Sequence, residues 1–148
     1  MSTIRITKQF RFEMAHVLLG YDGPCKNVHG HSYELSVTVK GEPVTEHGHP
    51  KLGMVMDFGD LKKIVRGQII EVFDHALVLN KMMPETISMH LQQHFEKVIL
   101  LDYQPTSEMM VADFAGRIAS LLPEKLKLVH VLLRETATSY AEWFAEDN

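Results

Sequence analysis

Residues 25–40, CKNVHGHSYELSVTVK, contain the pattern that decides the fold. Over residues 31–40 apolar and polar side chains alternate, which predicts a strand with one buried face and one polar face. Side chains two positions apart in a strand point to the same side, so His29 and His31 project together and in phase with Tyr33. The inward face of this strand therefore begins with two potential metal ligands.

A second alternating run covers residues 4–16 and ends in another histidine. Its even positions are mostly apolar, so His16 ends the inward face of this strand. Three neutral imidazoles suit zinc, which is usually four-coordinate, and they leave a fourth position for a substrate or water. We therefore predict a catalytic zinc site made of His16, His29 and His31. The alternative, three ordinary core histidines, would require three separate buried partners.

Composition narrows the class of protein. The 148 residues, 45% of them hydrophobic, suffice for one domain with a real core, which we expect to span residues 1–148. One cysteine cannot form an internal disulfide, and no signal peptide or membrane span is evident, so a cytoplasmic protein is expected. The net charge of -4 argues against broad nucleic-acid binding and favours a small ligand.

The remaining pattern predicts helices between two pairs of strands. This order gives an α+β fold, with helices packed on one side of an antiparallel sheet. The breaker-rich residues 41–53 are expected to form a surface excursion. The expected helices cover residues 57–73, 84–97 and 105–122. Besides residues 4–16 and 31–40, the expected strands cover 98–101, between the second and third helices, and then 126–135 and 140–144.

Cys25 is a candidate general base. It lies in a loop rich in Gly and Pro, beside the predicted zinc site and Lys26, and positive surroundings lower the pKa of a thiol. A lone cysteine is more often a small buried hydrophobe, but its position here favours the catalytic interpretation. Asp74 and His75, adjacent at a helix end, could polarise the thiol if the fold brings them near it.

Two acidic residues are further candidates. Glu135 follows Val131 and Leu133 at strand spacing and should face inward, where an unpaired carboxylate is costly, so we expect a ligand or a catalytic group beside it. Glu108 lies in the first turn of the helix that Thr106 opens. There it either stabilises the helix dipole or binds a ligand, and the sequence leaves both possibilities open.

Two other histidine pairs are weaker metal candidates. His47 and His49 repeat the His-Gly-His tripeptide, but no alternating strand flanks them. His90 and His94 have the spacing of two ligands on one helix face, but they lack the Glu of the helical zinc-protease motif. We therefore favour solvent-exposed roles for both pairs.

Taken together, the motifs resemble the 6-pyruvoyltetrahydropterin synthase family, and more closely its bacterial 6-carboxytetrahydropterin synthase branch of queuosine biosynthesis. The three-residue spacer between the cysteine and the paired histidines favours that branch. The likeness spans nearly the whole chain. It rests on Phe12 to His16, Cys25 with His29, Gly30 and His31, Met56 to Phe58, Asp74 and His75 with Leu79 and Asn80, Pro105 to Glu108, and Glu135 with Thr136.

The resemblance implies the tunnelling fold. In that fold a four-stranded antiparallel sheet carries helices on one face, and subunits join edge to edge into trimeric barrels that stack into hexamers. The active sites of the family lie between subunits. Cys25 is therefore expected to meet Asp74 and His75 of a neighbouring chain rather than its own.

The resemblance also implies the chemistry. The family substrate is 7,8-dihydroneopterin triphosphate, whose side-chain hydroxyls bind the zinc ion while the Cys25 thiolate removes a carbon-bound proton. By the same likeness Asp74 and His75 tune the thiol and Glu135 handles protons, while Glu108 and Thr106 bind the pterin. No redox cofactor is implied.

Three features depart from compact bacterial members of the family. The stretches near His47 and from Lys81 to Asp102 are longer, and Met109 follows Glu108 where a polar residue is commoner. Two alternatives stay open at this point: a synthase that makes the pyruvoyl product, and a catalytically silent zinc-binding oligomer of the same fold.

Overall fold

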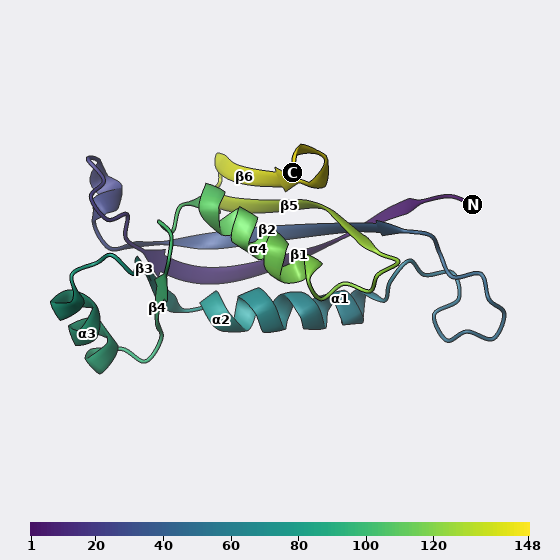
Figure 1. Cartoon of the computed structure of the whole chain (residues 1–148), viewed down its shortest axis with the longest axis horizontal. Helices are drawn as coiled ribbons and strands as arrows, with labels where there is room; N and C mark the ends of the chain where they lie inside the picture. The colour runs from purple at the N-terminus through teal and green to yellow at the C-terminus, as the bar shows by residue number, and fades with distance from the viewer.

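The chain folds around one mixed β-sheet with the strand order β4-β3-β1-β2-β5-β6 (Figure 1). The computed structural model describes all residues, 1–148. The strands are β1 (Ile4–His16), β2 (His29–Gly41), β3 (Ala76–Asn80), β4 (Val98–Leu101), β5 (Lys127–Thr136) and β6 (Ser139–Phe144).

β1 and β2 form a long antiparallel ribbon in the centre of this sheet. Their pairing runs from Ile4 opposite Gly41 to His16 opposite His29, so the alternation in both runs produces strands as expected. β2 begins at His29 rather than at residue 31. This register places the last residue of β1 beside the first residue of β2, and the predicted metal ligands therefore lie at one end of the ribbon.

The expected four-stranded, wholly antiparallel sheet is wrong on two counts. The sheet has six strands, and β3 pairs in parallel with both β1 and β4. β3 was missed because its sequence, ALVLN, is a short apolar run without alternation, which is typical of parallel strands buried on both faces. β5 and β6 continue the sheet antiparallel on the other side of β2, as predicted.

The helices match three predicted segments with shorter ends. One helical stretch of residues 58–73 begins after Asp57, whose carboxylate accepts from Gly59 N at 2.7 Å, and passes through a π-helical turn. α3 and β4 occupy the extra length noted between Lys81 and Asp102. The elements are α1 (Phe58–Val65), the π-helical turn (Arg66–Ile70), α2 (Glu71–Phe73), α3 (Glu85–His94) and α4 (Ser107–Ala119).

The core lies between one face of the sheet and the helices. Phe12 and Tyr33, opposite each other on β1 and β2, stack with ring centroids 5.1 Å apart. The Phe114 ring of α4 packs edge-to-face with the Phe12 ring, with centroids 6.3 Å apart, and Phe114 is fully buried. Truncation of such an aromatic residue to Ala typically costs about 3–5 kcal/mol. The same packed face leads directly to the histidines at the end of the ribbon.

The ends of the ribbon differ in structure (Figure 1). Residues 42–57 form no helix or strand at one end, as expected for the excursion. At the other end lie α3, β4 and the loop of residues 17–28, in which Pro24–Lys26 form a single 3-10 turn. No helix has both the length and the apolar composition that a membrane span requires.

Candidate active site

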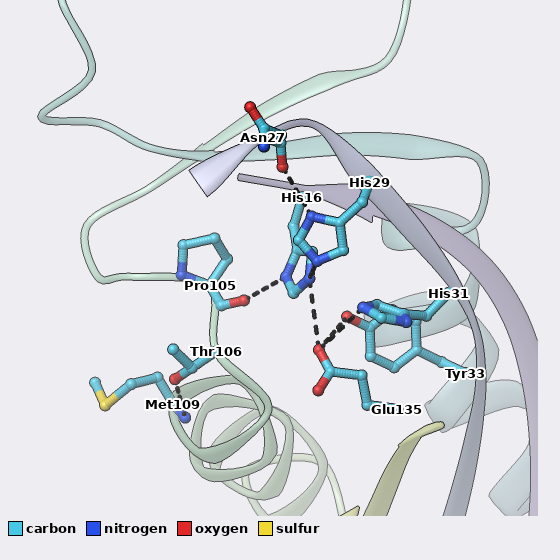
Figure 2. A network of polar contacts seen from close by, with 9 residues as sticks. All are labelled: His16, Asn27, His29, His31, Tyr33, Pro105, Thr106, Met109 and Glu135. Atoms are coloured by element: carbon cyan, nitrogen blue, oxygen red, sulfur yellow. Dashed lines mark hydrogen bonds and ion pairs between the residues drawn. The ribbon is translucent and has the colours of Figure 1, made fainter. Parts of the chain in front are cut away.

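Three imidazoles meet at the end of the β1–β2 ribbon, as the strand phase predicted (Figure 2). One donor atom from each of His16, His29 and His31 can be chosen so that all three lie within 4.8 Å of one another. His16 Nε2 and His29 Nε2 are 3.0 Å apart. The His16 side chain is only 1% exposed, so its inner nitrogen is well shielded from bulk water.

Two backbone carbonyls orient these rings. His16 Nδ1 donates to Pro105 O at 2.7 Å, and His29 Nδ1 donates to Asn27 O at 2.8 Å. A carbonyl oxygen only accepts, so each Nδ1 carries the proton and each Nε2 presents a lone pair to the centre of the cluster. Ligands of a bound cation are commonly held by carbonyl partners in this way.

The arrangement of the three histidines is more typical of metal ligands than of core histidines that hydrogen-bond to separate partners. The facing Nε2 lone pairs of His16 and His29 repel each other, and the buried Nε2 of His31 has no hydrogen-bond partner. Burial lowers the pKa of both His16 and His31, and so favours the neutral form that binds metal. A divalent ion among the three nitrogens would satisfy all of them at once. The donor set, three nitrogens with room for a further ligand, suits zinc.

Glu135 reaches this cluster from β5, as its inward phase predicted. Its Oε1 lies 3.4 Å from His16 Nε2 and 3.4 Å from His31 Nε2. Tyr33 OH donates to the same oxygen at 3.4 Å. Burial, together with the charge of Glu135, raises the pKa of Tyr33, which keeps the phenol protonated as a donor. Tyr33 was not predicted as a site residue, although it follows His31 at strand spacing.

The N-terminus of α4 lies beside the cluster because Pro105 contacts His16. Thr106 is the N-cap residue, and its Oγ1 accepts from Met109 N at 3.3 Å. Glu108 is exposed in the first turn, and its carboxylate makes no hydrogen bond or ion pair within the chain. It is therefore free to receive a ligand near the histidines, and it also has the position that stabilises a helix dipole.

Asp74 and His75 form a pair at the junction between α2 and β3. His75 Nδ1 lies 3.0 Å from Asp74 Oδ2, while Asp74 Oδ1 accepts from Glu13 N at 2.9 Å. His75 has a φ of 62°, and its N–H donates to Glu13 O. Burial alone would raise the pKa of Asp74, but the hydrogen bonds from Glu13 and His75 hold it below its ordinary value.

Within one chain no hydrogen bond joins this pair to Cys25, which lies half-buried in the 3-10 turn. The His75 side chain is 77% exposed. The pair lines a cavity of about 910 Å³ together with apolar residues that include Leu91 and Phe95.

The two other histidine pairs have no third ligand. His49 Nδ1 accepts from Lys51 N at 3.0 Å and so has a structural role in the excursion. The rings of His90 and His94 lie side by side on α3, with centroids 4.5 Å apart, and both residues are exposed. Among His, Cys, Asp and Glu side chains, only the cluster of His16, His29 and His31 brings three donors together.

Known proteins resemble the chain over nearly its whole length. Residues 5–146 match the family model described as 6-pyruvoyl tetrahydropterin synthase. A 6-carboxy-5,6,7,8-tetrahydropterin synthase from Haemophilus influenzae is 36% identical over 141 residues, which cover 94% of this chain and 97% of the relative. The proteins of the same name from Aquifex aeolicus and Rickettsia bellii are 33% and 32% identical, covering 95% and 94% of this chain and 98% and 99% of the relatives.

Solved structures share the fold at lower identity. An uncharacterized protein from Wolinella succinogenes superposes with a TM-score of 0.77 at 20% identity, covering 98% of this chain and 99% of that chain. The 6-pyruvoyl tetrahydropterin synthase of Caenorhabditis elegans gives a TM-score of 0.69 at 23% identity, with coverages of 98% and 97%. Both superpositions cover 98% of this chain, so the shared fold includes nearly all of its helices and strands.

Proposed function

The chain belongs to the 6-pyruvoyl tetrahydropterin synthase family, and from this premise we propose that it is a zinc-dependent 6-carboxy-5,6,7,8-tetrahydropterin synthase of queuosine biosynthesis. It would convert 7,8-dihydroneopterin triphosphate and water to 6-carboxytetrahydropterin, acetaldehyde and triphosphate, acting in the cytoplasm. The observation that carries the proposal is the convergence of three imidazoles with an orphaned buried Nε2 on His31. The names of the relatives that cover the whole chain support the choice of reaction.

His16, His29 and His31 would hold the ion through the nitrogens that face the centre of the cluster. When bound, a zinc ion would supply Lewis-acid polarisation of the hydroxyl oxygens on the substrate side chain. Glu135 would accept or return protons beside those hydroxyls, since its Oε1 already lies against His16 and His31. Tyr33 keeps that oxygen hydrogen-bonded in the absence of substrate.

Glu108 and Thr106 would bind the pterin ring. An ionised carboxylate accepts hydrogen bonds only, which matches the amino group and ring N–H donors of a pterin. Glu108 is unpaired and lies one turn from Pro105, whose carbonyl contacts the ligand His16. The pterin would thus be fixed at the start of α4, with its side chain directed toward the histidines.

Cys25 would remove the proton from the substrate side chain, and Asp74 with His75 would tune its thiol from a neighbouring chain. This assignment agrees with the absence of a hydrogen bond between Cys25 and the pair within one chain and with the exposure of His75. The pair itself is already built, with Asp74 fixing the His75 ring. Within a single chain the pair makes no hydrogen bond to a thiol.

Open sheet edges support an oligomer, which we propose to be a hexamer made of two trimers. β3 pairs with β1 only at Met14–His16, so most of that edge of β1 has no partner, and β6 leaves the other end of the sheet open. A long unpaired edge is a template for pairing with another chain, so we expect further subunits to cover these edges. Light scattering on the purified protein tests this assembly, and a monomer that turns over substrate would contradict it.

The function itself is tested by incubating zinc-loaded protein with 7,8-dihydroneopterin triphosphate. Mass spectrometry of the pterin product and an assay for acetaldehyde should show 6-carboxytetrahydropterin and acetaldehyde in equal amounts. A product that keeps the three-carbon side chain would instead identify a pyruvoyl synthase, the activity for which the matching family is named. Substrate binding without turnover would identify a silent zinc-binding oligomer.

A further inference from the structure

The segment from Tyr103 to Thr106 connects β4 with α4, and its residues are fixed to different parts of the molecule. Tyr103 OH donates to Asp113 Oδ2 of α4 at 2.6 Å. Pro105 O accepts from the predicted metal ligand His16 at 2.7 Å. Thr106 caps α4. The segment is therefore a rigid link between the core and the cluster, and Gln104 lies in the middle of it.

Gln104 makes three hydrogen bonds through its side-chain amide. Its Oε1 accepts from Leu19 N and from Asn80 Nδ2, both at 3.2 Å, and its Nε2 donates to Leu19 O at 2.9 Å. The amide thus pairs with both backbone groups of Leu19, much as a neighbouring strand would. The contacts join residues that are 85 and 24 positions apart in the sequence, so no local pattern predicts them.

Leu19 belongs to the loop of residues 17–28 that carries Cys25. Leu18 N donates to Cys25 O at 3.1 Å, and Tyr21 N donates to Leu18 O at 3.3 Å, so the loop closes on itself around this point. Between residues 18 and 26 the only hydrogen bonds to a residue outside the loop are the two to Gln104. Loss of the Gln104 amide would therefore remove the hydrogen bonds that join residues 18–26 to the rest of the fold, while residues 17 and 27 stay attached at the two ends of the loop.

We propose that Gln104 is a positioning residue that fixes the Cys25 loop relative to His16 and to the first turn of α4. It also holds Asn80 at the end of β3, the strand that follows the Asp74–His75 pair. The inference rests on the proposed function only in giving Cys25 its catalytic role. The placement of the loop follows from the hydrogen bonds alone.

The test compares three full-length variants. Gln104→Met keeps a side chain of similar length and removes all three hydrogen bonds. Gln104→Glu keeps an acceptor for Leu19 N and Asn80 but cannot donate to Leu19 O, so it should give an intermediate effect. Gln92→Met, on the exposed surface of α3, is the matched control and should behave as the unaltered protein.

The primary measurement is amide hydrogen exchange followed by mass spectrometry, because it requires no substrate. The proposal predicts faster exchange in Gln104→Met in peptides from residues 17–28, with little change in the β1–β2 ribbon and with zinc content unchanged. In the turnover assay kcat should fall by about 10- to 100-fold while KM changes little, since a small misplacement of a catalytic group has effects of this size.

Two results would overturn the proposal: unchanged exchange in residues 17–28, or an equal rise in all peptides of the sheet, which would show a general loss of stability. If Gln104→Met does not fold, the same two criteria apply to Gln104→Glu. Because exchange is measured without substrate, an inactive wild-type protein would contradict the proposed function and leave the exchange result to decide the role of Gln104.

Discussion

The β1–β2 ribbon and the segment from Asp74 to Leu101 differ in how much of a site one chain completes. At the end of the ribbon three imidazoles, Glu135 and two backbone carbonyls already face one another. In the other segment Asp74 and His75 contact each other, the His75 side chain is 77% exposed, and no thiol is hydrogen-bonded to either residue. One chain can thus assemble the whole predicted metal site, whereas the proposed tuning of the Cys25 thiol would need a second chain.

The largest effect should follow from removal of a predicted metal ligand at the end of the β1–β2 ribbon, where one chain supplies all three histidines. His29→Ala leaves two imidazoles and breaks the contact between Nδ1 and Asn27 O, so we expect zinc to be lost and turnover to fall to background. Elemental analysis of the purified variant and the acetaldehyde assay provide the measurement. His90→Ala on exposed α3 is the control and should keep both metal and activity. Full zinc content in His29→Ala would contradict the assignment.

Removal of the thiol should separate catalysis from metal binding. Cys25 makes no contact with the three ligands in the hydrogen-bond network, so Cys25→Ala should keep its zinc and its affinity for pterin. Loss of a general base typically slows the reaction by about 10² to 10⁴, and we expect kcat to fall within that range. Steady-state kinetics with parallel zinc analysis tests this. Near wild-type kcat would place the base elsewhere, with His75 or Glu135 as the next candidates.

A smaller effect is expected from Tyr33→Phe. This change removes the donor to Glu135 Oε1 but keeps the ring that stacks on Phe12. The lost hydrogen bond is long and should contribute about 1 kcal/mol, which corresponds to roughly a fivefold fall in kcat with zinc unchanged. Tyr140→Phe, on the exposed side of β6, is the control and should be neutral. A loss of zinc in Tyr33→Phe would show that the phenol acts on the ligands rather than on Glu135.

The two regions should also respond differently to acid. Burial lowers the pKa of His16 and His31 in the folded chain, so the unfolded chain binds more protons below the ordinary histidine value of 6.5. Zinc-free protein should therefore lose stability as the pH falls through 6.5. The pKa of Asp74 is also lowered, and its contribution is present above the ordinary value of 3.8 and lost as the pH falls below that value.

Urea unfolding between pH 8 and pH 3 distinguishes the two contributions. His16→Phe should reduce the loss of stability near pH 6, and Asp74→Asn should reduce only the loss near pH 4 and below. The effect of Asp74, whose side chain is 36% exposed, should amount to about 1 kcal/mol or less because solvent screens its charge interactions. If Asp74→Asn also alters the free energy of unfolding near pH 6, the two regions are coupled within one chain.

The same difference between local pattern and long-range contact decides which parts of the fold and of the site could be predicted from the sequence. Alternation along β1 and β2 placed His16, His29 and His31 on one inward face, because strand phase is a local property. The two-residue spacing from Val131 and Leu133 placed Glu135 on the same side. β3 offered no such signal, since ALVLN is buried in a parallel pairing and shows no alternation. The link from Gln104 to Leu19 depends on residues 85 positions apart, so only the folded chain reveals it.

The central claim, that one chain supplies the histidines and Cys25 while its neighbour supplies Asp74 and His75, is tested most directly by complementation. Cys25→Ala and His75→Ala chains, each inactive alone, are unfolded together and reassembled with zinc in equal amounts. Random assembly then gives an intact site at about a quarter of the interfaces, so about a quarter of the wild-type activity should return. Reassembly of Cys25→Ala with the double variant should return none. Mixed oligomers that stay inactive would contradict the claim.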